Sequence, residues 1–367
     1  MADVEEQREA LVERLFRASL GMGEVLTVYL GDTLGLYRAL ERAGPLTAAQ
    51  LADRAAIAER YAREWLEQQA AAGILEVDDV TTEPGGRRYT LPAGHVEPLL
   101  HPDSPYSIAP LCKSYVAIAG VMPDLLAAYR SGSGVPWTAY GRDMVQAQGD
   151  FNRPWLVGSL GAEYFPSIPD VHERLASERG ARVADVACGL GWAGISLARA
   201  YPNVTVDGFD LDELSIEIAR ENASRAGVAD RVRFEARDAA EPSLEGRYDV
   251  AIVVESVHDM SNPVEVLASI RRMLQPGGTL VVADERTEDS FTAPAGEVER
   301  LFYTYSVLCC LPSGLDERPS AATGTVMRRS TFERYAQQAG FDGVAVLPIE
   351  HEFLRFYRMD APPEAPV

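Results

Sequence analysis

The sequence predicts an α/β fold, a parallel sheet with helices on both faces, preceded by a smaller and mainly helical domain. From residue 181 onward, strand-like and helix-like segments alternate, which is typical of a parallel sheet. At 367 residues the chain is longer than one ordinary domain, and 47% hydrophobic residues suffice for a sizeable core. We therefore expect two domains.

The first hundred residues predict helices followed by a hairpin. Helical apolar spacing runs over residues 11–43, Thr47 can cap a second helix in LTAAQLADRAA, and ERYAREWLEQQAAAG predicts a third. The segment ILEVDDVTTEPGGRRYTLP then predicts two short strands around Pro84-Gly85-Gly86. This order is that of a winged helix, which we assign to residues 1–105.

The charge of the chain argues against DNA as its partner, although a winged helix can read DNA. The formal net charge is -21, and acidic residues outnumber basic ones 17 to 10 in residues 1–100. Binding to phosphates needs clustered Lys and Arg. We expect no nucleic acid and no membrane partner, and a dimerisation or substrate-covering role for this domain. A ligand-sensing DNA-binding regulator is the alternative from a different class.

The cysteines and the N-terminus bear on compartment and metal binding. Cys112, Cys188, Cys309 and Cys310 show no C-x-x-C spacing, and only five histidines accompany them. Neither a disulfide framework nor a metal site is therefore expected. The acidic N-terminus lacks the apolar segment of a signal peptide, and no 18 uncharged apolar residues run together. These observations favour a cytoplasmic protein.

The remaining chain divides into three predicted parts. Residues 106–165 are expected to be a helical linker and active-site lid. Within them, 131–154 is punctuated by Gly, Ser and Pro and is expected to be an irregular linker or lid before the next regular element. Residues 166–360 carry the alternating segments, and the closely spaced extended runs GVAVLPI and EFLRFY can pair antiparallel. Residues 361–367 are expected to be a disordered tail. The predicted strands are RVADVA, VTVDGF, RVRFEA, YDVAIVV and TLVVAD.

Residues 188–194 read Cys-Gly-Leu-Gly-Trp-Ala-Gly, a complete G-x-G-x-x-G. Taken alone, this turn suggests a dinucleotide site. Asp185 lies four residues before Gly189, where a carboxylate suits a ligand with an amino group and a sulfonium better than two phosphates. Asp210, about twenty residues after the turn, can accept hydrogen bonds from ribose hydroxyls in either case. The turn therefore favours a cationic ligand.

Four motifs in order resemble the class I S-adenosylmethionine-dependent methyltransferases: D-x-A-C-G-x-G, G-F-D-x-D, R-D-A and L-Q-P-G-G-T-L. The resemblance covers residues 180–358. It implies a Rossmann-like seven-stranded sheet with an antiparallel last strand, and S-adenosylmethionine as the cofactor. It also implies the cofactor-binding residues Asp185, Cys188, Gly189, Gly191, Trp192, Asp210, Leu211, Asp238, Ala239 and Glu255. Among these, Asp210 would bind the ribose, and Asp238 with the Ala239 amide the adenine.

The whole chain also resembles an actinobacterial-type subgroup with an N-terminal winged-helix domain. This resemblance implies a homodimer formed through that domain and a small-molecule acceptor, methylated on oxygen in preference to nitrogen or carbon. Tyr29, Tyr140 and Asn152 lie in strings similar to the subgroup and are candidates for the acceptor pocket. A rival within enzymes is that the cofactor is itself the substrate, as in relatives that close its aminobutyrate part into an azetidine ring.

His258 is the candidate catalytic residue. It matches the His-Asp of winged-helix O-methyltransferases, whose histidine deprotonates a hydroxyl, a task that suits an imidazole at neutral pH. Those enzymes usually continue with Trp-x-Asp, whereas this chain has Met260-Ser261-Asn262. The alternative is that His258 and Asp259 fix the loop before Pro263.

Trp192 is a second departure from the family pattern, because bulky aromatic residues are uncommon directly after the second glycine. The indole could contact the sulfonium through a cation–π interaction worth roughly 0.5 to 2 kcal/mol. The alternative is that Trp192 packs the first helix of the domain onto the sheet.

Overall fold

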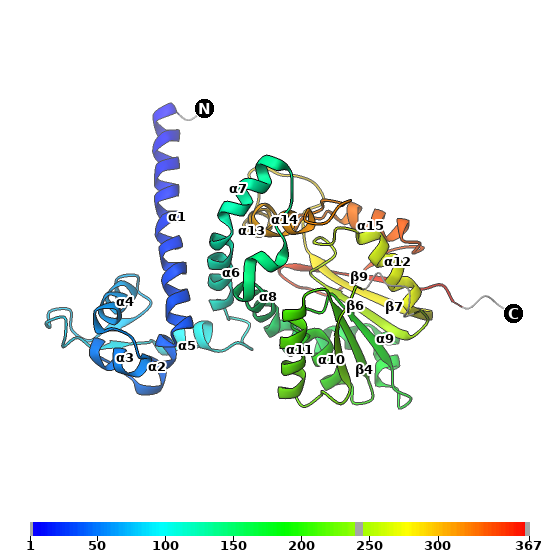
Figure 1. Cartoon of the computed structure of the whole chain (residues 1–367), viewed down its shortest axis with the longest axis horizontal. Helices are drawn as coiled ribbons and strands as arrows, with labels where there is room; N and C mark the ends of the chain where they lie inside the picture. Colours follow the sequence, from blue (N-terminus) through cyan, green and yellow to red (C-terminus); the bar gives the residue numbers. More distant parts are fainter. Residues whose placement is uncertain (1–2, 239–244, 364–367) are drawn as a thin grey trace. The chain divides into compact units, whose positions relative to one another are not determined.

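The structure, a computed structural model, describes residues 3–238 and 245–363, and the chain divides into two compact units between Ala117 and Ile118 (Figure 1). The first unit holds the predicted winged helix and the second holds the predicted sheet. The finer division into linker, lid and tail stays a prediction, and residues 364–367 of the predicted tail lie outside the described residues.

The N-terminal unit has the helix order of a winged helix, as predicted. Its elements are α1 (Val4–Thr33), α2 (Leu36–Ala43), α3 (Ala48–Ala55), α4 (Glu59–Ala71), the antiparallel pair β1 (Glu76–Val77) and β2 (Tyr89–Thr90), and α5 (Ala93–Leu100). The single helix expected over 11–43 is wrong, because the chain breaks between α1 and α2. Gly35 has φ of 68°, a left-handed conformation that ends one helix and starts the next.

Local hydrogen bonds and a small core stabilise this unit. Thr47 caps α3 as predicted: its hydroxyl accepts from the Gln50 amide at 3.3 Å, and Gln50 Oε1 accepts from the Thr47 amide at 3.0 Å. Tyr37 is fully buried and meets the Trp65 ring edge-on at 5.1 Å, and the Tyr37 hydroxyl donates to Gln69. The helices are thus held by packing as well as by their caps.

The region before the sheet is helical, as the prediction of a helical linker over 106–165 implies, but the helices also run through 131–154, where Gly, Ser and Pro predicted an irregular stretch. Its elements are α6 (Ala109–Gly120), α7 (Met122–Ser131), the 3-10 turn η1 (Trp137–Tyr140), α8 (Gly141–Trp155), the π-helix η2 (Leu156–Tyr164) and η3 (Phe165–Ser167). Gly149 is tolerated within α8 because it packs closely: a Cβ there would lie 2.3 Å from the Leu190 side chain. The close packing of α8 on Leu190 therefore outweighs the local tendency of Gly149 to interrupt a helix.

The second unit contains a seven-stranded sheet of order β5-β4-β3-β6-β7-β9-β8 (Figure 1). All neighbours among β3 to β7 are parallel, and β9 is antiparallel to both β7 and β8, as predicted. The strands are β3 (Arg182–Val186), β4 (Thr205–Asp210), β5 (Val232–Ala236), β6 (Tyr248–Val254), β7 (Leu274–Glu285), β8 (Ala345–Val346) and β9 (Leu354–Asp360). The segment Leu-Gln-Pro-Gly-Gly of the fourth motif forms the start of β7.

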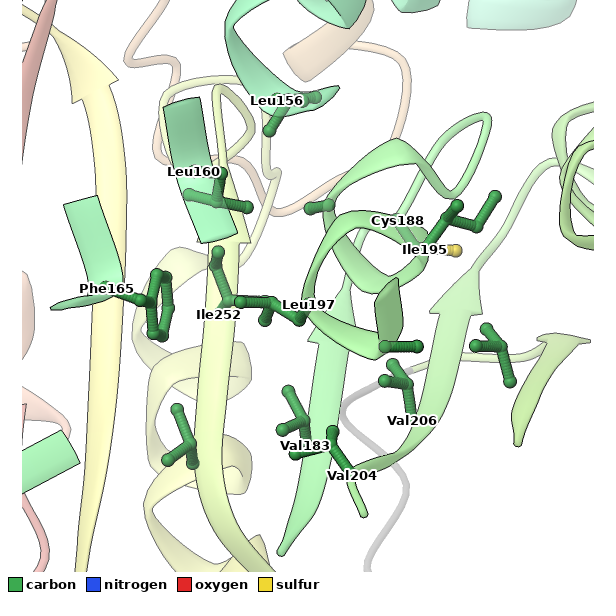
Figure 2. Close-up of a cluster of buried hydrophobic side chains, with 14 of the residues drawn as sticks. Leu156, Leu160, Phe165, Val183, Cys188, Ile195, Leu197, Val204, Val206 and Ile252 are labelled. Atoms are coloured by element: carbon green, nitrogen blue, oxygen red, sulfur yellow. The ribbon is translucent and has the colours of Figure 1, made fainter. Parts of the chain in front are cut away.

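Helices cover both faces of this sheet. Side chains from α9 (Pro169–Ala176), α10 (Trp192–Ala200) and α11 (Glu213–Arg225) form one buried cluster with Val183 and Val206, part of which Figure 2 shows. Helices α12 (Pro263–Met273) and α15 (Arg329–Gln338) pack on the other face with Ala184. Successive residues of β3 thus point to opposite faces of the sheet. Because helices cover both faces, most side chains of this strand are buried and apolar.

Three further segments follow β7: α13 (Glu297–Tyr305), the π-helix η5 (Ser306–Cys310) and α14 (Leu311–Gly314). Among the described residues, no single helix is both long and apolar enough to cross a membrane. Helices α6 and α7 pass that test only together, as a pair bent by 59°.

Candidate active site

The glycine turn after β3 places two glycines in left-handed conformations with different surroundings. Gly191 has φ of 77°, and a Cβ there would lie 2.3 Å from the Phe234 ring. Gly189 has φ of 50°, and among the described atoms nothing lies within 4 Å of the position of a Cβ. Gly191 therefore serves close packing, whereas Gly189 leaves space for a ligand.

Asp210 ties this turn to the end of β4. Its Oδ2 accepts from the Gly189 amide at 2.8 Å and its Oδ1 accepts from the Asp212 amide at 2.9 Å. Burial raises the pKa of Asp210 above its ordinary value. The neighbouring Leu211 is 67% exposed, so an apolar side chain lies open beside the carboxylate.

The end of β5 lies next to Asp210. The Arg237 amide donates to the Asp210 carbonyl at 2.8 Å, which keeps the adjoining Asp238 near the same edge of the sheet. Asp238 is exposed. Ala239, whose amide the sequence assigned to the adenine, lies outside the described residues.

Asp185 lies beneath the turn and is only 1% exposed. Its Oδ2 accepts from the Gly194 amide in the first turn of α10 at 2.9 Å. Burial raises the pKa of Asp185 to about 7, against the opposing effect of that hydrogen bond. Cys188 is also buried, and burial raises the pKa of its thiol. The turn thus covers a carboxyl group that a nearby cation would stabilise in its ionised form.

The raised pKa of Asp185 predicts how the stability of the ligand-free protein varies with pH. The unfolded chain ionises this carboxyl near its ordinary pKa, whereas the folded chain holds the proton to about 7. The stability that the folded chain gains by keeping this carboxyl group protonated is therefore lost as pH rises from the ordinary pKa toward 7, on the order of 4 kcal/mol in all. Urea unfolding between pH 5 and 7.5 should show a shallower decline for Asp185→Asn than for the wild type; equal slopes would contradict the assignment.

Glu255 lies at the end of β6 and faces α8. It has φ of 46°, uncommon for a residue with a side chain, and its Oε2 accepts from Asn152 Nδ2 at 2.7 Å and Gln148 Nε2 at 2.9 Å. Burial raises the pKa of Glu255 to about 7. Asn152 is fixed in turn, because its Oδ1 accepts from Trp155 Nε1 at 3.0 Å. The structure thus brings together two predicted site residues, Asn152 and Glu255.

His258 is 2% exposed, and carboxylates face both of its ring nitrogens. Nδ1 donates to Asp284 Oδ1 at 2.9 Å and lies 2.7 Å from Glu285 Oε2, while Nε2 lies 3.2 Å from Asp259 Oδ1. Burial alone would lower the pKa of His258, but Asp259, Glu285 and Asp284 outweigh it and hold that pKa well above its ordinary value. These carboxylates thus favour the doubly protonated, cationic form of the ring in the ligand-free protein.

Trp192 begins α10 and packs against two groups of buried side chains. One is the cluster between α9 to α11 and the sheet, and the other consists of Val145, Leu190 and Ile218. The Arg153 guanidinium lies over its ring, 4.4 Å from the centroid. Its Nε1 is buried without a hydrogen-bond partner among the described residues. One face of the ring thus already meets a cation of the chain itself, and contact with a sulfonium stays a prediction.

The other pocket candidates lie in different parts of the chain. Tyr140 is buried in η1, and its hydroxyl donates to the Leu308 carbonyl at 2.9 Å. Tyr29 is in α1, within the N-terminal unit.

Sequence reasoning missed Gln148, Asp284, Glu285 and Cys310, which contact or adjoin Glu255 and His258. The acidic pair was detectable, because it ends the strand next to β6 and parallel strands place their carboxyl ends at one edge.

Two families match successive parts of the chain. Residues 23–100 match the family described as "Rv2258c-like winged HTH domain", and residues 177–318 match that described as "Methyltransferase domain". The chain is a winged-helix domain followed by a methyltransferase domain. The site described above lies at the carboxyl ends of the methyltransferase strands, where open α/β sheets bind their ligands.

Curated relatives match parts of the chain. The chain is 30% identical to "Methyltransferase GfsG" of Streptomyces halstedii over 179 residues, 48% of this chain and 64% of that protein. It is 39% identical to the "27-O-demethylrifamycin SV methyltransferase" of Amycolatopsis mediterranei over 106 residues, 29% of this chain and 39% of that protein. The matches thus span less than two thirds of either relative.

Solved structures share the fold across almost the whole chain. The mitomycin 7-O-methyltransferase MmcR superposes with a TM-score of 0.68 at 19% identity, covering 97% of this chain and 99% of that one. Human N-acetylserotonin methyltransferase, solved with its cofactor SAM, gives 0.66 at 18% identity, with coverages of 99% and 100%. At this identity the similarities show a shared fold, in which an α/β sheet follows a winged-helix domain.

Proposed function

We propose that this protein transfers a methyl group from S-adenosylmethionine to a small molecule, with oxygen favoured over nitrogen or carbon as the acceptor atom. The observation that carries the proposal is the edge of the sheet around Gly189. There an open glycine turn adjoins the carboxyl groups of Asp185 and Asp210 and the exposed Leu211. Buried carboxyl groups beside apolar surface fit a cationic nucleoside better than a dinucleotide.

Each residue has a proposed part in holding the cofactor, whose bound sulfonium supplies an electrophilic methyl group. Asp210 is positioned by two backbone amides so that it can accept from ribose hydroxyls. Asp238 is proposed for the adenine, and Asp185 and the turn around Gly189 and Gly191 for the methionyl part, with Gly189 leaving the space and Gly191 closing the turn by packing on Phe234. Glu255, held by Asn152 and Gln148, is proposed as a further cofactor-binding carboxyl group. The task of this frame is alignment and exclusion of water.

His258 remains the proposed base for a hydroxyl acceptor, with one condition that the structure adds. Because three carboxylates raise its pKa, the ring must lose a proton before it can accept one. If His258 is the base, His258→Ala should lower turnover by about 10²- to 10⁴-fold while the Kd for S-adenosylmethionine stays the same. Full turnover of the variant with a hydroxyl acceptor would remove the assignment.

Mass spectrometry of reaction products tests the proposed activity. The full chain is incubated with S-adenosylmethionine alone and with small phenolic or hydroxylated acceptors. S-adenosylhomocysteine should appear only with an acceptor, together with a product one methyl group heavier. Methylthioadenosine formed without an acceptor would instead indicate cyclisation of the cofactor, and salt-sensitive binding of duplex DNA would favour a regulator.

Trp192→Leu tests whether the indole contacts the sulfonium. S-adenosylmethionine carries the positive charge, whereas S-adenosylhomocysteine is neutral at sulfur but otherwise alike. If the ring packs only against protein, the two ligands should lose affinity equally, by less than about threefold. If it faces the sulfonium, only S-adenosylmethionine should weaken, by roughly 3- to 30-fold. Calorimetric titration of both ligands into wild type and variant measures this difference.

We further propose a homodimer formed through α1. The exposed side chains of this 30-residue helix include Leu11, Leu15, Met22, Leu26 and Leu30, which are four or seven residues apart and therefore lie along one side of the helix. A second copy could cover this stripe by packing its own α1 alongside. Light scattering after gel filtration should report a dimer for the wild type and a monomer for Leu15→Arg. A wild-type monomer would contradict the proposal.

A cytoplasmic role in secondary metabolism completes the proposal. Cys112, Cys188, Cys309 and Cys310 are all unpaired, which suits a reducing compartment. The names of two similar proteins refer to rifamycin and mitomycin. Acceptors of that complexity are therefore the first to test.

A further inference from the structure

A later part of the chain holds the loop that carries His258. This loop lies between β6 and α12. The His258 carbonyl accepts from the Gly324 amide at 3.1 Å, and the Ser261 carbonyl accepts from the Ala321 amide at 2.8 Å. The Ser261 hydroxyl also donates to the Gly314 carbonyl at 3.0 Å. Three hydrogen bonds thus join this loop to a segment that lies more than 50 residues further along the chain.

This segment, residues 314–324, which we call the clamp segment, approaches its neighbours closely. A Cβ at Gly314 would lie 3.0 Å from the Asp259 carbonyl oxygen. Gly324 has φ of 72°, and a Cβ there would lie 2.5 Å from a side-chain hydroxyl of η5. Ala322 has φ of 50°, a left-handed conformation that is uncommon for a residue with a side chain. The clamp segment therefore keeps a disfavoured backbone where it meets the loop, as segments at functional sites often do.

The ring of His258 is fixed separately from its backbone. Nδ1 donates to Asp284 Oδ1 at 2.9 Å, near the end of β7, and both side chains are buried. A ring held at one nitrogen alone can still pivot about that hydrogen bond. Because the Gly324 amide holds the His258 carbonyl at the same time, the two attachments together set the direction of Nε2.

The placement of Nε2 decides whether His258 can act as a base. A general base must lie within hydrogen-bond reach of the proton that it takes, and a misplacement of about 1 Å can lower the rate about 100-fold. Ser261 belongs to Met260-Ser261-Asn262, where winged-helix O-methyltransferases usually have Trp-x-Asp. The chain thus supplies a hydroxyl that fixes the loop at the point where it departs from the family pattern.

We propose that Ser261 is a positioning residue for His258, and that the clamp segment keeps Nε2 directed at the acceptor hydroxyl. This inference rests on the proposed base role of His258. Ser261 acts through the Gly314 carbonyl and the loop backbone rather than on the reacting atoms. Loss of its hydroxyl therefore lowers kcat but leaves cofactor affinity unchanged, because the hydrogen bonds around Gly189 remain in place.

Ser261→Ala in the full chain tests this role. With a hydroxyl acceptor, kcat should fall roughly 5- to 50-fold, while the Kd for S-adenosylmethionine stays within about twofold. Ser261→Thr keeps a hydroxyl and should restore most of the lost rate. The matched control is Ser167→Ala, which removes a hydroxyl that donates to the Tyr164 carbonyl at 2.6 Å in η3 and should change neither quantity. Wild-type kcat in Ser261→Ala would overturn the proposal.

Nuclear magnetic resonance of the ligand-free protein separates this role from the proposed activity. The five histidines are isotopically labelled, and the His258 signals are assigned by their loss in His258→Ala. Ser261→Ala should shift the ring signals of His258, and Ser167→Ala should leave them in place. A wild type that transfers no methyl group would contradict the proposed function alone. Unshifted His258 signals in Ser261→Ala would overturn the positioning role, whether or not the wild type is active.

Gly324→Ala disturbs the same loop from the clamp segment. Because the added Cβ would lie 2.5 Å from a hydroxyl of η5, the amide that is bonded to His258 must move. We expect kcat to fall at least as far as in Ser261→Ala, at an unchanged Kd. Circular dichroism checks that the variant is folded, and Gly314→Ala, whose Cβ would meet the Asp259 carbonyl, replaces it if it is not. A folded clamp variant with the kcat and the His258 signals of the wild type would overturn the role of this segment.

Discussion

Replacing Asp210 with asparagine is expected to weaken S-adenosylmethionine binding by roughly 10- to 100-fold, the equivalent of charge-assisted hydrogen bonds worth about 1.5 to 3 kcal/mol. In the ligand-free protein its oxygens accept from Gly189 and Asp212 at 2.8 and 2.9 Å, which orients the carboxylate at the end of β4. Asparagine keeps the shape but loses the charge and one acceptor. Isothermal titration calorimetry with S-adenosylmethionine measures the change in Kd.

Asp207→Asn is the matched control for this prediction. Asp207 lies on the same strand, three residues earlier, and accepts from Arg182 at 3.0 Å and from the Tyr248 hydroxyl at 3.0 Å. It is therefore an aspartate of β4 away from the glycine turn. Asp207→Asn should leave the Kd within about twofold. If both variants bound the cofactor as the wild type does, the ribose assignment of Asp210 would be wrong.

Gly191→Ala is expected to destabilise the protein by about 2 to 4 kcal/mol. The backbone at Gly191 has φ of 77°, which a side chain disfavours, and the added Cβ would lie 2.3 Å from the Phe234 ring. Phe234 is buried on β5, so it has little room to move away. Urea unfolding, followed by circular dichroism, measures the change in the free energy of unfolding.

Gly189→Ala separates ligand space from packing within the same turn. Gly189 also has a positive φ, 50°, but among the described atoms no neighbour lies within 4 Å of the added Cβ. The cost to stability should therefore be about 1 to 2 kcal/mol, from backbone strain alone. Cofactor affinity should fall more than in Asp207→Asn, because the methyl group enters the open space. Equal destabilisation by both glycine variants would contradict the different roles inferred for them.

Several parts of the fold could be predicted because local signals and tertiary packing agree. The alternating segments from residue 181 predicted β3 to β7, and the short separation of the last two runs predicted that β8 and β9 pair antiparallel. The Thr47 cap was predicted from its own side chain and confirmed. The continuous helix over 11–43 was wrong because the left-handed Gly35 interrupts a continuous apolar pattern.

The stretch 131–154 shows why local signals can fail. Its glycines and prolines favour an irregular linker, yet α8 begins at Gly141 and continues through Gly149. A side chain at Gly149 would collide with Leu190, so the glycine allows close packing of the helix. Because Leu190 is 41 residues away in sequence, no local pattern reports that contact.

By itself the sequence determined the methyltransferase sheet, the winged helix and the glycine turn with Asp185 and Asp210. These features depend on periodicity, turn chemistry and the order of motifs, all of which are local in the chain. Only the tertiary structure decided the surroundings of Trp192, Glu255 and His258. Arg153, Gln148 and Cys310 approach them from α8 and η5, and contacts between distant segments arise from how helices pack, which residue spacing does not encode.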